Sequence, residues 1–218
     1  MLKIGESNNK YHSSLTQQQR GDLVVKRTTE NTNNMKKTFT KQYLIDNRGC
    51  YELSQVEALL CINNESITLN DLFNELPIKD FFWWLIRKCD LTESQKISFA
   101  VHCAEQVLPL FEAKFPNDFR VRECLEATKK FFSGEITKEE LEVKRKAADA
   151  AAADADAAAA DAAADAAYAG FSAAAAAISI YTNNSAFGAA EFAAIAATYA
   201  YTTTAYKKSM WKFILTLK

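Results

Sequence analysis

The chain has 218 residues, a formal net charge of −1 and 49% hydrophobic residues. This length suits one ordinary domain or slightly more, and the apolar content is enough to build a core. The near-neutral charge argues against nucleic acid as a partner, because proteins that bind it carry a clear excess of lysine and arginine.

Residues 1–34 are rich in asparagine, glutamine, threonine and serine, and their longest apolar run is Leu23–Val25. A segment that buries so little cannot offset the entropy of ordering, so it is predicted to be a disordered extension. The folded part is expected to begin near Met35. The N-terminus lacks the apolar run of a secretory signal, and the five cysteines form no C-x-x-C pair. Both features predict reduced thiols and a cytoplasmic protein, in the host cytoplasm if a phage encodes it.

Helix start signals recur from about residue 38 onwards. In these signals a serine or threonine is followed three positions later by an acid or amide, and the two side chains cap each other's backbone N–H groups. Short helices are predicted at 38–46, 54–61 and 68–75. The four signals begin at Ser54, Thr68, Thr92 and Thr137.

Three longer helices are expected next. The stretch "IKDFFWWLIRKC" is apolar on most sides, which is typical of a helix at the centre of a core. The helix that begins at Thr92 has a regular apolar stripe, is expected to kink or break at Pro109 and ends at Pro116. The third ends at Gly134. No segment alternates with period two for long enough to predict a strand.

The region after Thr137 is dominated by alanine, the best helix former. It predicts a helix over 137–182, either continuous or broken at Gly170, a turn at Asn183–Asn184 and an antiparallel return. Its large residues are expected to act as packing pegs between the alanine faces: Tyr168, Phe171, Ile178, Tyr181, Phe187, Phe192, Ile195, Tyr199 and Tyr206. The predicted fold is all-α, a helical bundle at 35–136 carrying a long Ala-rich antiparallel helical hairpin at 137–218.

Five aspartates interrupt the alanines, and their directions suggest two edges. At 100° per residue, Asp154, Asp161 and Asp165 fall within about 40° of one another, and Asp149 and Asp156 point elsewhere. One interpretation is solvation, because charged edges keep an alanine helix soluble. The other is that the three aspartates on one edge receive a basic protein partner.

Catalytic motifs are missing from the sequence. It has two histidines, His12 and His102, and no zinc, nucleotide-binding or nucleophile-elbow motif. His102 and Cys103 are neighbours on a helix, where side chains point about 100° apart, so they cannot act as nucleophile and base. We therefore expect no enzyme, cofactor or metal site. Three functional classes remain: a binding protein, a structural scaffold and an enzyme that uses carboxylates alone. The enzyme is the weakest of them.

The middle of the chain, "VLPLFEAKFPNDFRVRECLEATKKFFSGEIT", followed by alanines with interspersed tyrosine and aspartate, resembles an immunity-protein family of bacteria and phages. The family pattern combines an apolar "LPxFE", a "PxDxRPR" segment and a "GEI" turn. The matching positions are Leu108, Pro109, Phe111, Glu112, Pro116, Asp118, Arg120, Arg122 and Gly134–Ile136, and Val121 stands where the family has proline. The resemblance covers about residues 65–180.

This resemblance implies a non-enzymatic binder that occludes a toxin or, in a phage, a host defence protein. It brings no catalytic residues. Asp118 is expected to cap the next helix, and Arg120 and Arg122 in its first turns to need carboxylate partners, with Glu112 a candidate. They are interpreted as a structural clamp or as a surface pair for a partner. The alternative function is an oligomerising helical scaffold. No membrane association is expected.

Overall fold

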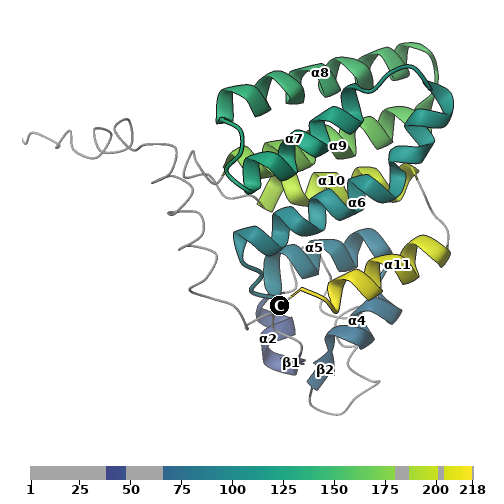
Figure 1. Ribbon diagram of the computed structural model, residues 1–218. Coiled ribbons are helices and arrows are strands. Elements are labelled where there is room, and N and C mark those ends of the chain that lie inside the picture. Colours follow the sequence, from purple (N-terminus) through teal and green to yellow (C-terminus); the bar gives the residue numbers. More distant parts are fainter. Residues whose placement is uncertain (1–37, 48–65, 180–186, 201–203, 218) are drawn as a thin grey trace, which may run out of the picture.

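The computed structural model describes residues 38–47, 66–179, 187–200 and 204–217. Most of them are helical, so the predicted all-α class is confirmed (Figure 1). The elements are β1 (Thr38–Thr40), α2 (Lys41–Asp46), β2 (Ser66–Thr68), α4 (Leu69–Glu75), α5 (Ile78–Lys88), α6 (Glu93–Lys114), α7 (Arg120–Phe132), α8 (Lys138–Ala157), α9 (Asp161–Ser179), α10 (Phe187–Ala200) and α11 (Thr204–Ile214). The predicted extension at 1–34 and the predicted helix at 54–61 lie outside the described residues.

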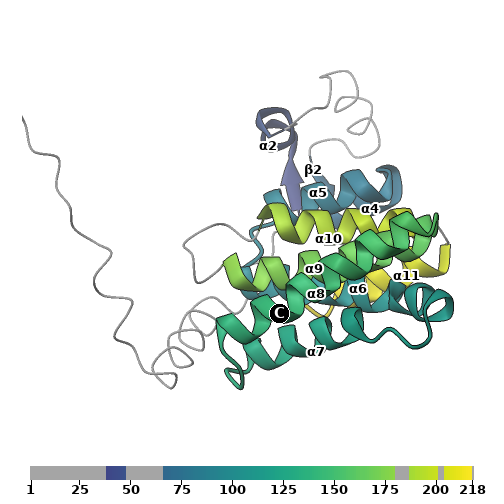
Figure 2. The same ribbon diagram turned by 90° about the horizontal axis from the view of Figure 1, so that it is seen from above.

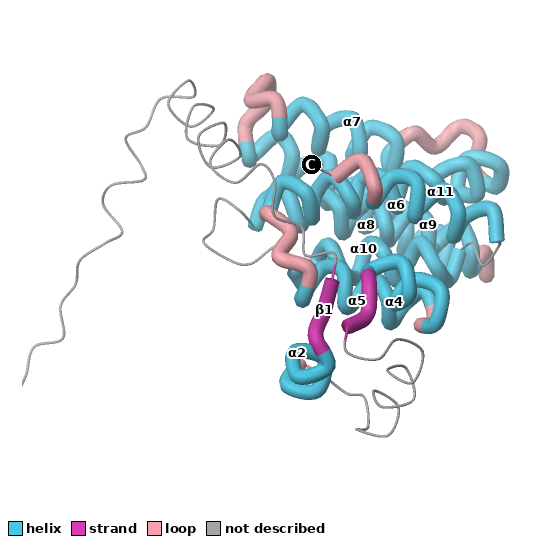
Figure 3. Tube along the Cα trace, turned by 90° about the horizontal axis from the view of Figure 1, so that it is seen from below, coloured by secondary structure: helices cyan, strands magenta, loops and turns pink. Residues whose placement is uncertain are grey.

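The small sheet was not predicted. β1 and β2 form an antiparallel pair in which Phe39 lies opposite Ile67 (Figure 3). Each strand is three residues long and buries one side chain between two exposed ones. Three residues are too few to show an alternating pattern in the sequence. The adjoining threonines are helix-capping residues, so the sequence predicted helices there. The predicted helices at 38–46 and 68–75 therefore begin later, at Lys41 and Leu69.

The predicted start signals are confirmed wherever the structure describes them. Thr68, Thr92 and Thr137 each accept a hydrogen bond from the backbone of the third helical residue, whose side chain accepts one from the backbone N–H of the threonine. These reciprocal bonds satisfy two N–H groups that an open helix end leaves unpaired. The box at Ser54 lies outside the described residues.

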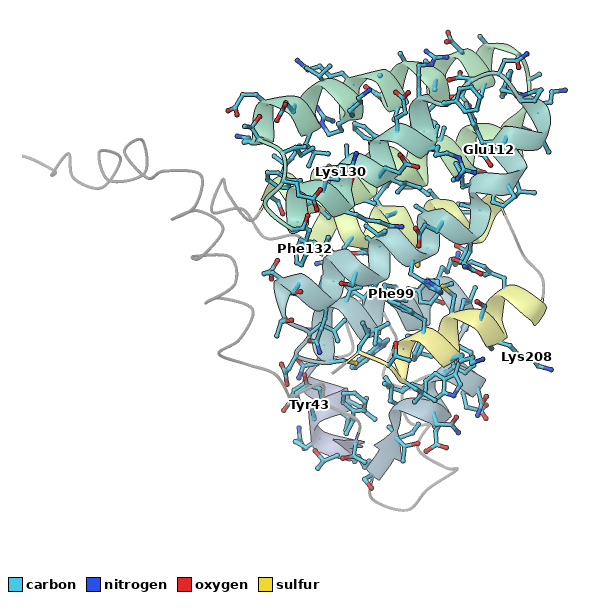
Figure 4. The ribbon with its side chains drawn as sticks, viewed as in Figure 1. Tyr43, Phe99, Glu112, Lys130, Phe132 and Lys208 are labelled. Carbon is cyan, nitrogen blue, oxygen red and sulfur yellow. The ribbon has the colours of Figure 1, made fainter. Side chains whose placement is uncertain are left out.

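The expected kink or break at Pro109 does not end the helix, because α6 continues through it to Lys114. Pro109 is exposed, so the carbonyl that lacks a hydrogen bond from its missing N–H lies on the solvent-facing side of the helix. α5 is buried on most sides, as expected, and Phe82 lies edge-on against Phe99 of α6, with 5.0 Å between the ring centroids (Figure 4).

The alanine-rich helix is broken, but not at Gly170. α8 ends at Ala157, α9 begins at Asp161, and Gly170 is buried in the middle of α9. The break is a helix-ending turn in which the Ala160 N–H donates to the Ala155 carbonyl and the Ala159 N–H to that of Asp156. This turn requires a left-handed residue, and Ala159 supplies it with φ of 50°. Alanine gives no sequence signal for such a turn.

Replacing Ala159 by glycine should raise the free energy of unfolding by about 0.5–1 kcal/mol. The left-handed conformation costs an L-residue about 1–2 kcal/mol, and the greater entropy of unfolded glycine offsets part of that gain. Ala153, exposed within α8, gives the matched control, because glycine there should cost about 1 kcal/mol. Urea unfolding should therefore give changes of opposite sign, and a loss of stability in both variants would contradict the turn.

α9 occupies the middle of the upper part of the molecule. It packs against α6, α7, α8 and α10, and α10 also packs against α5 and α6. In Figure 1, α8 lies at the top, and in Figure 2 α10 and α7 lie on opposite sides of α8 and α9. The antiparallel Ala-rich pairing is present, and the division into domains at residue 136 stays a prediction.

Candidate partner-binding surface

Arg120 joins the start of α7 to α8. Its guanidinium donates to both carboxylate oxygens of Asp118, at 2.6–3.1 Å, and to Asp154 Oδ2 at 2.7 Å. Asp118 was expected to be the N-cap of α7, but that position is Phe119, one residue later. Asp118 still accepts a hydrogen bond from the backbone N–H of Arg120 in the first turn. Hydrogen bonds from Arg120 hold the pKa of Asp118 below its usual range.

Arg122 makes the second clamp. Its Nε and Nη2 each lie 2.6 Å from an oxygen of Glu112, the predicted partner. This parallel two-bond geometry is the strongest that arginine makes with a carboxylate, and it joins the end of α6 to the start of α7 (Figure 4). Hydrogen bonding to Glu112 raises the pKa of Arg122. The geometry of both arginines favours the structural-clamp interpretation.

The aspartates do not share the edges expected from a continuous helix. Counting 100° per residue fails across the turn at Ala159, because α9 runs back antiparallel to α8. Asp154 faces α7 and pairs with Arg120. Asp161 and Asp165 instead lie near Asp156, since both Asp156 and Asp161 influence the titration of Asp165. The expected grouping of Asp154 with Asp161 and Asp165 was therefore wrong.

A second group of carboxylates lies where α8 meets α9. The Tyr168 hydroxyl donates to Asp156 Oδ2 at 2.8 Å, and Asp149 is close enough to influence the pKa of Tyr168. Partial burial, together with the charges of Asp156 and Asp161, raises the pKa of Asp165. Within the described ranges, none of these carboxylates forms an ion pair. We call Asp149, Asp156, Asp161 and Asp165 the acidic edge.

Replacing Asp165 by asparagine should raise the melting temperature at pH 7. A raised pKa means that the folded state binds this proton more readily than the unfolded chain, so the ionised carboxylate destabilises the fold at neutral pH. The gain should shrink as the pH falls towards the unfolded value of about 3.9. Asp154→Asn is the control, because it removes the pair with Arg120 and should give no gain. Equal melting curves for Asp165→Asn and the parent protein would show that burial and the neighbouring carboxylates do not destabilise the ionised Asp165.

Two of the expected packing pegs point into solvent. Phe192 is 52% and Tyr199 63% exposed, and the buried positions of α10 are alanines and Thr198. The expectation that these two aromatics pack inside was therefore wrong. The spacing of Gly188, Phe192, Ile195 and Tyr199 places them on one outward face, and this 4-3-4 spacing was the signal available in the sequence.

The thiols and His102 belong to the packing. Cys89, Cys103 and Cys124 are buried and form no disulfide among the described residues, and burial raises the pKa of Cys124 to about 12. The His102 ring stacks on Phe213 with 3.9 Å between centroids, and burial lowers its pKa. Cys103 lies instead against Met210 Sδ, at 3.6 Å.

These features describe an all-α protein. The clamps of Arg120 and Arg122 hold its helices together, and its outer helices present aromatic and acidic side chains. The family model of the Imm-5 like putative immunity protein matches residues 90–214. The chain belongs to this family, which confirms the resemblance, and an immunity-type protein binds a protein partner. No curated protein and no solved structure matches the chain.

The described residues also bear on membrane and metal sites. No helix there is both long and apolar enough to cross a membrane. No group of three or more histidine, cysteine, aspartate or glutamate side chains in the same ranges is arranged to hold a metal ion.

Proposed function

We propose that this protein is a non-enzymatic inhibitor that binds a bacterial toxin, or in a phage a host defence protein, and blocks it by occlusion in the cytoplasm. The family match over residues 90–214 is the observation that carries this proposal. The exposed aromatics of α10 add to it, because aromatic side chains in the centre of an interface commonly supply much of the binding free energy.

The fold suits inhibition by occlusion. A binder of this kind needs a surface held rigidly in its bound shape, because ordering side chains and loops during association costs affinity. α9 is packed on several sides, and the clamps at Arg120 and Arg122 tie α7 to α8 and α6. The outer surface of α8, α9 and α10 is thus supported from behind by α6 and α7.

The direct test is to recover a partner and measure its activity. Tagged protein is used to capture partners from the lysate of the bacterium or phage host that carries the gene, and each partner is purified and assayed alone. We expect a toxin or defence protein whose activity disappears at about one equivalent of inhibitor. A partner that stays fully active in the saturated complex, or conversion of the partner by catalytic amounts of this protein, would overturn the proposal.

A scaffold role is the second candidate, since exposed aromatics between alanine-rich helices also suit self-association. Light scattering over a range of concentrations separates the two. A monomer supports the inhibitor, and growth into large assemblies supports the scaffold.

A further inference from the structure

The outward side of α10 is apolar and has no partner among the described residues. We call Gly188, Phe192, Ile195 and Tyr199 the α10 face. Its aromatic members are more than half exposed, and Ile195 is partly exposed. Most proteins bury such side chains, and a row of them along three turns of one helix is typical of an interaction site.

Neighbouring helices fix the sides of the α10 face. On one side Glu191 binds Arg87 of α5, with 2.7 Å between Oε2 and Nε. On the other side lies α9, which packs against both α10 and α8. Asp161 and Asp165 of the acidic edge therefore lie on the helix next to α10, and Asp149 and Asp156 lie on the helix after it; α10, α9 and α8 follow one another in Figure 2.

The charges on the two sides differ. Arg87, on the α5 side, is already paired with Glu191. Near the acidic edge, Arg145 interacts electrostatically with Asp149, lies 4.7 Å above the Phe171 ring and donates to Glu142 at 2.5–2.8 Å. Asp156, Asp161 and Asp165 form no ion pair within the described ranges. Partial burial and the charges of Asp156 and Asp161 raise the pKa of Asp165, so this part of the acidic edge carries negative charge that a cationic partner would offset.

We propose that the α10 face and the acidic edge together bind a protein partner whose apolar patch is bordered by lysine or arginine. Apolar side chains of the partner cover Phe192 and Tyr199, and its cations lie over the carboxylates of α8 and α9. This inference rests on the proposed function and names the surface that the inhibitor uses.

A second copy of the chain is the less suitable occupant. In a two-fold dimer centred on α10, each acidic edge would meet either the other acidic edge or the α5 side of the other copy. Like charges in contact oppose association, and the arginine on the α5 side is already paired with Glu191. A partner with free cations avoids both problems.

The test uses two designed helical peptides of about 18 residues, or five turns. One has a leucine face bordered by lysines, and the other has glutamates in place of the lysines. Binding of each fluorescent peptide to the full chain is measured by anisotropy at several salt concentrations. We expect the lysine peptide to bind at least about tenfold more tightly than the glutamate peptide, with affinity falling as salt increases.

Variants separate this surface from general attraction. Phe192→Ser with Tyr199→Ser, and separately Asp156→Asn with Asp165→Asn, should each weaken the lysine peptide about tenfold or more. The controls are Phe119→Ser, which removes an exposed aromatic at the start of α7, and Asp154→Asn. Circular dichroism checks that each variant is folded, and both controls should bind like the parent.

Three outcomes would overturn the inference: equal affinity for both peptides, equal losses in the controls, or a concentration-dependent dimer that Phe192→Ser abolishes. The last outcome would assign the α10 face to a second copy. None of them decides the proposed function, because the captured partner is assayed by the loss of its own activity.

Discussion

Replacing Gly170 by alanine should destabilise the protein by about 1–3 kcal/mol relative to the same replacement at Gly188. A β-carbon at Gly170 would lie 2.8 Å from Val121 Cγ1, well inside van der Waals contact. Val121 is fully buried in α7, and its branched side chain has little rotamer freedom with which to move away. A β-carbon at Gly188 would meet no atom within 4 Å.

Helix propensity acts against the steric conflict and cannot produce the expected loss. Gly170 lies in the middle of α9 and Gly188 in the first turn of α10, so alanine gains up to about 1 kcal/mol at Gly170 and less at Gly188. A lower unfolding free energy for Gly170→Ala than for Gly188→Ala therefore reports the steric conflict. Val121→Ala makes room for the new methyl group and should recover part of the loss in the double variant. If Gly170→Ala proved as stable as Gly188→Ala, α7 and α9 could not be as close as the structure places them.

Replacing Leu141 by alanine should cost about 2–5 kcal/mol of unfolding free energy. Leu141 is fully buried, and the other buried residues of α8 are the alanines at 148, 151, 152 and 155. Each alanine buries little apolar area, so one leucine contributes a large share of the hydrophobic free energy that holds α8 in place.

Val143 provides the matched control, because it lies two residues further along the same helix and is 67% exposed. Val143→Ala should change stability by no more than about 0.5 kcal/mol. Denaturant titrations of the two variants give the comparison directly. Similar midpoints for both would show that Leu141 does not anchor α8.

The parts of the fold set by local chemistry were predictable. The threonines at 68, 92 and 137 mark three helix starts because a cap depends on residues only three positions apart. Gly134, with φ of 80°, ends α7 in the same kind of turn as Ala159. Local chemistry did not reveal the turn at Ala159, since contacts of α8 and α9 with the rest of the molecule hold an alanine in a conformation it disfavours.

The candidate site was predictable only in part. Arg122 and Glu112 could be paired from the sequence because a cation near a helix N-terminus needs a carboxylate, and Glu112 was close by in the motif. Which side of α10 faces the interior could not be predicted, because both sides are apolar. Close packing places the smaller side chains in the interior. Phe192 and Tyr199 were consequently assigned to the wrong side.

The use of alanine in the interior divides the molecule into two parts that tolerate different kinds of substitution. Around α5 and α6 the core is built from large side chains such as Phe81, Phe82, Trp84 and Phe99, so the harmful changes are losses of atoms. In α9 and α10 the buried side chains are almost all single methyl groups, so the harmful changes are additions. Natural variation should therefore be confined there to the smallest residues, while the outward positions remain free to diversify with whatever protein they meet.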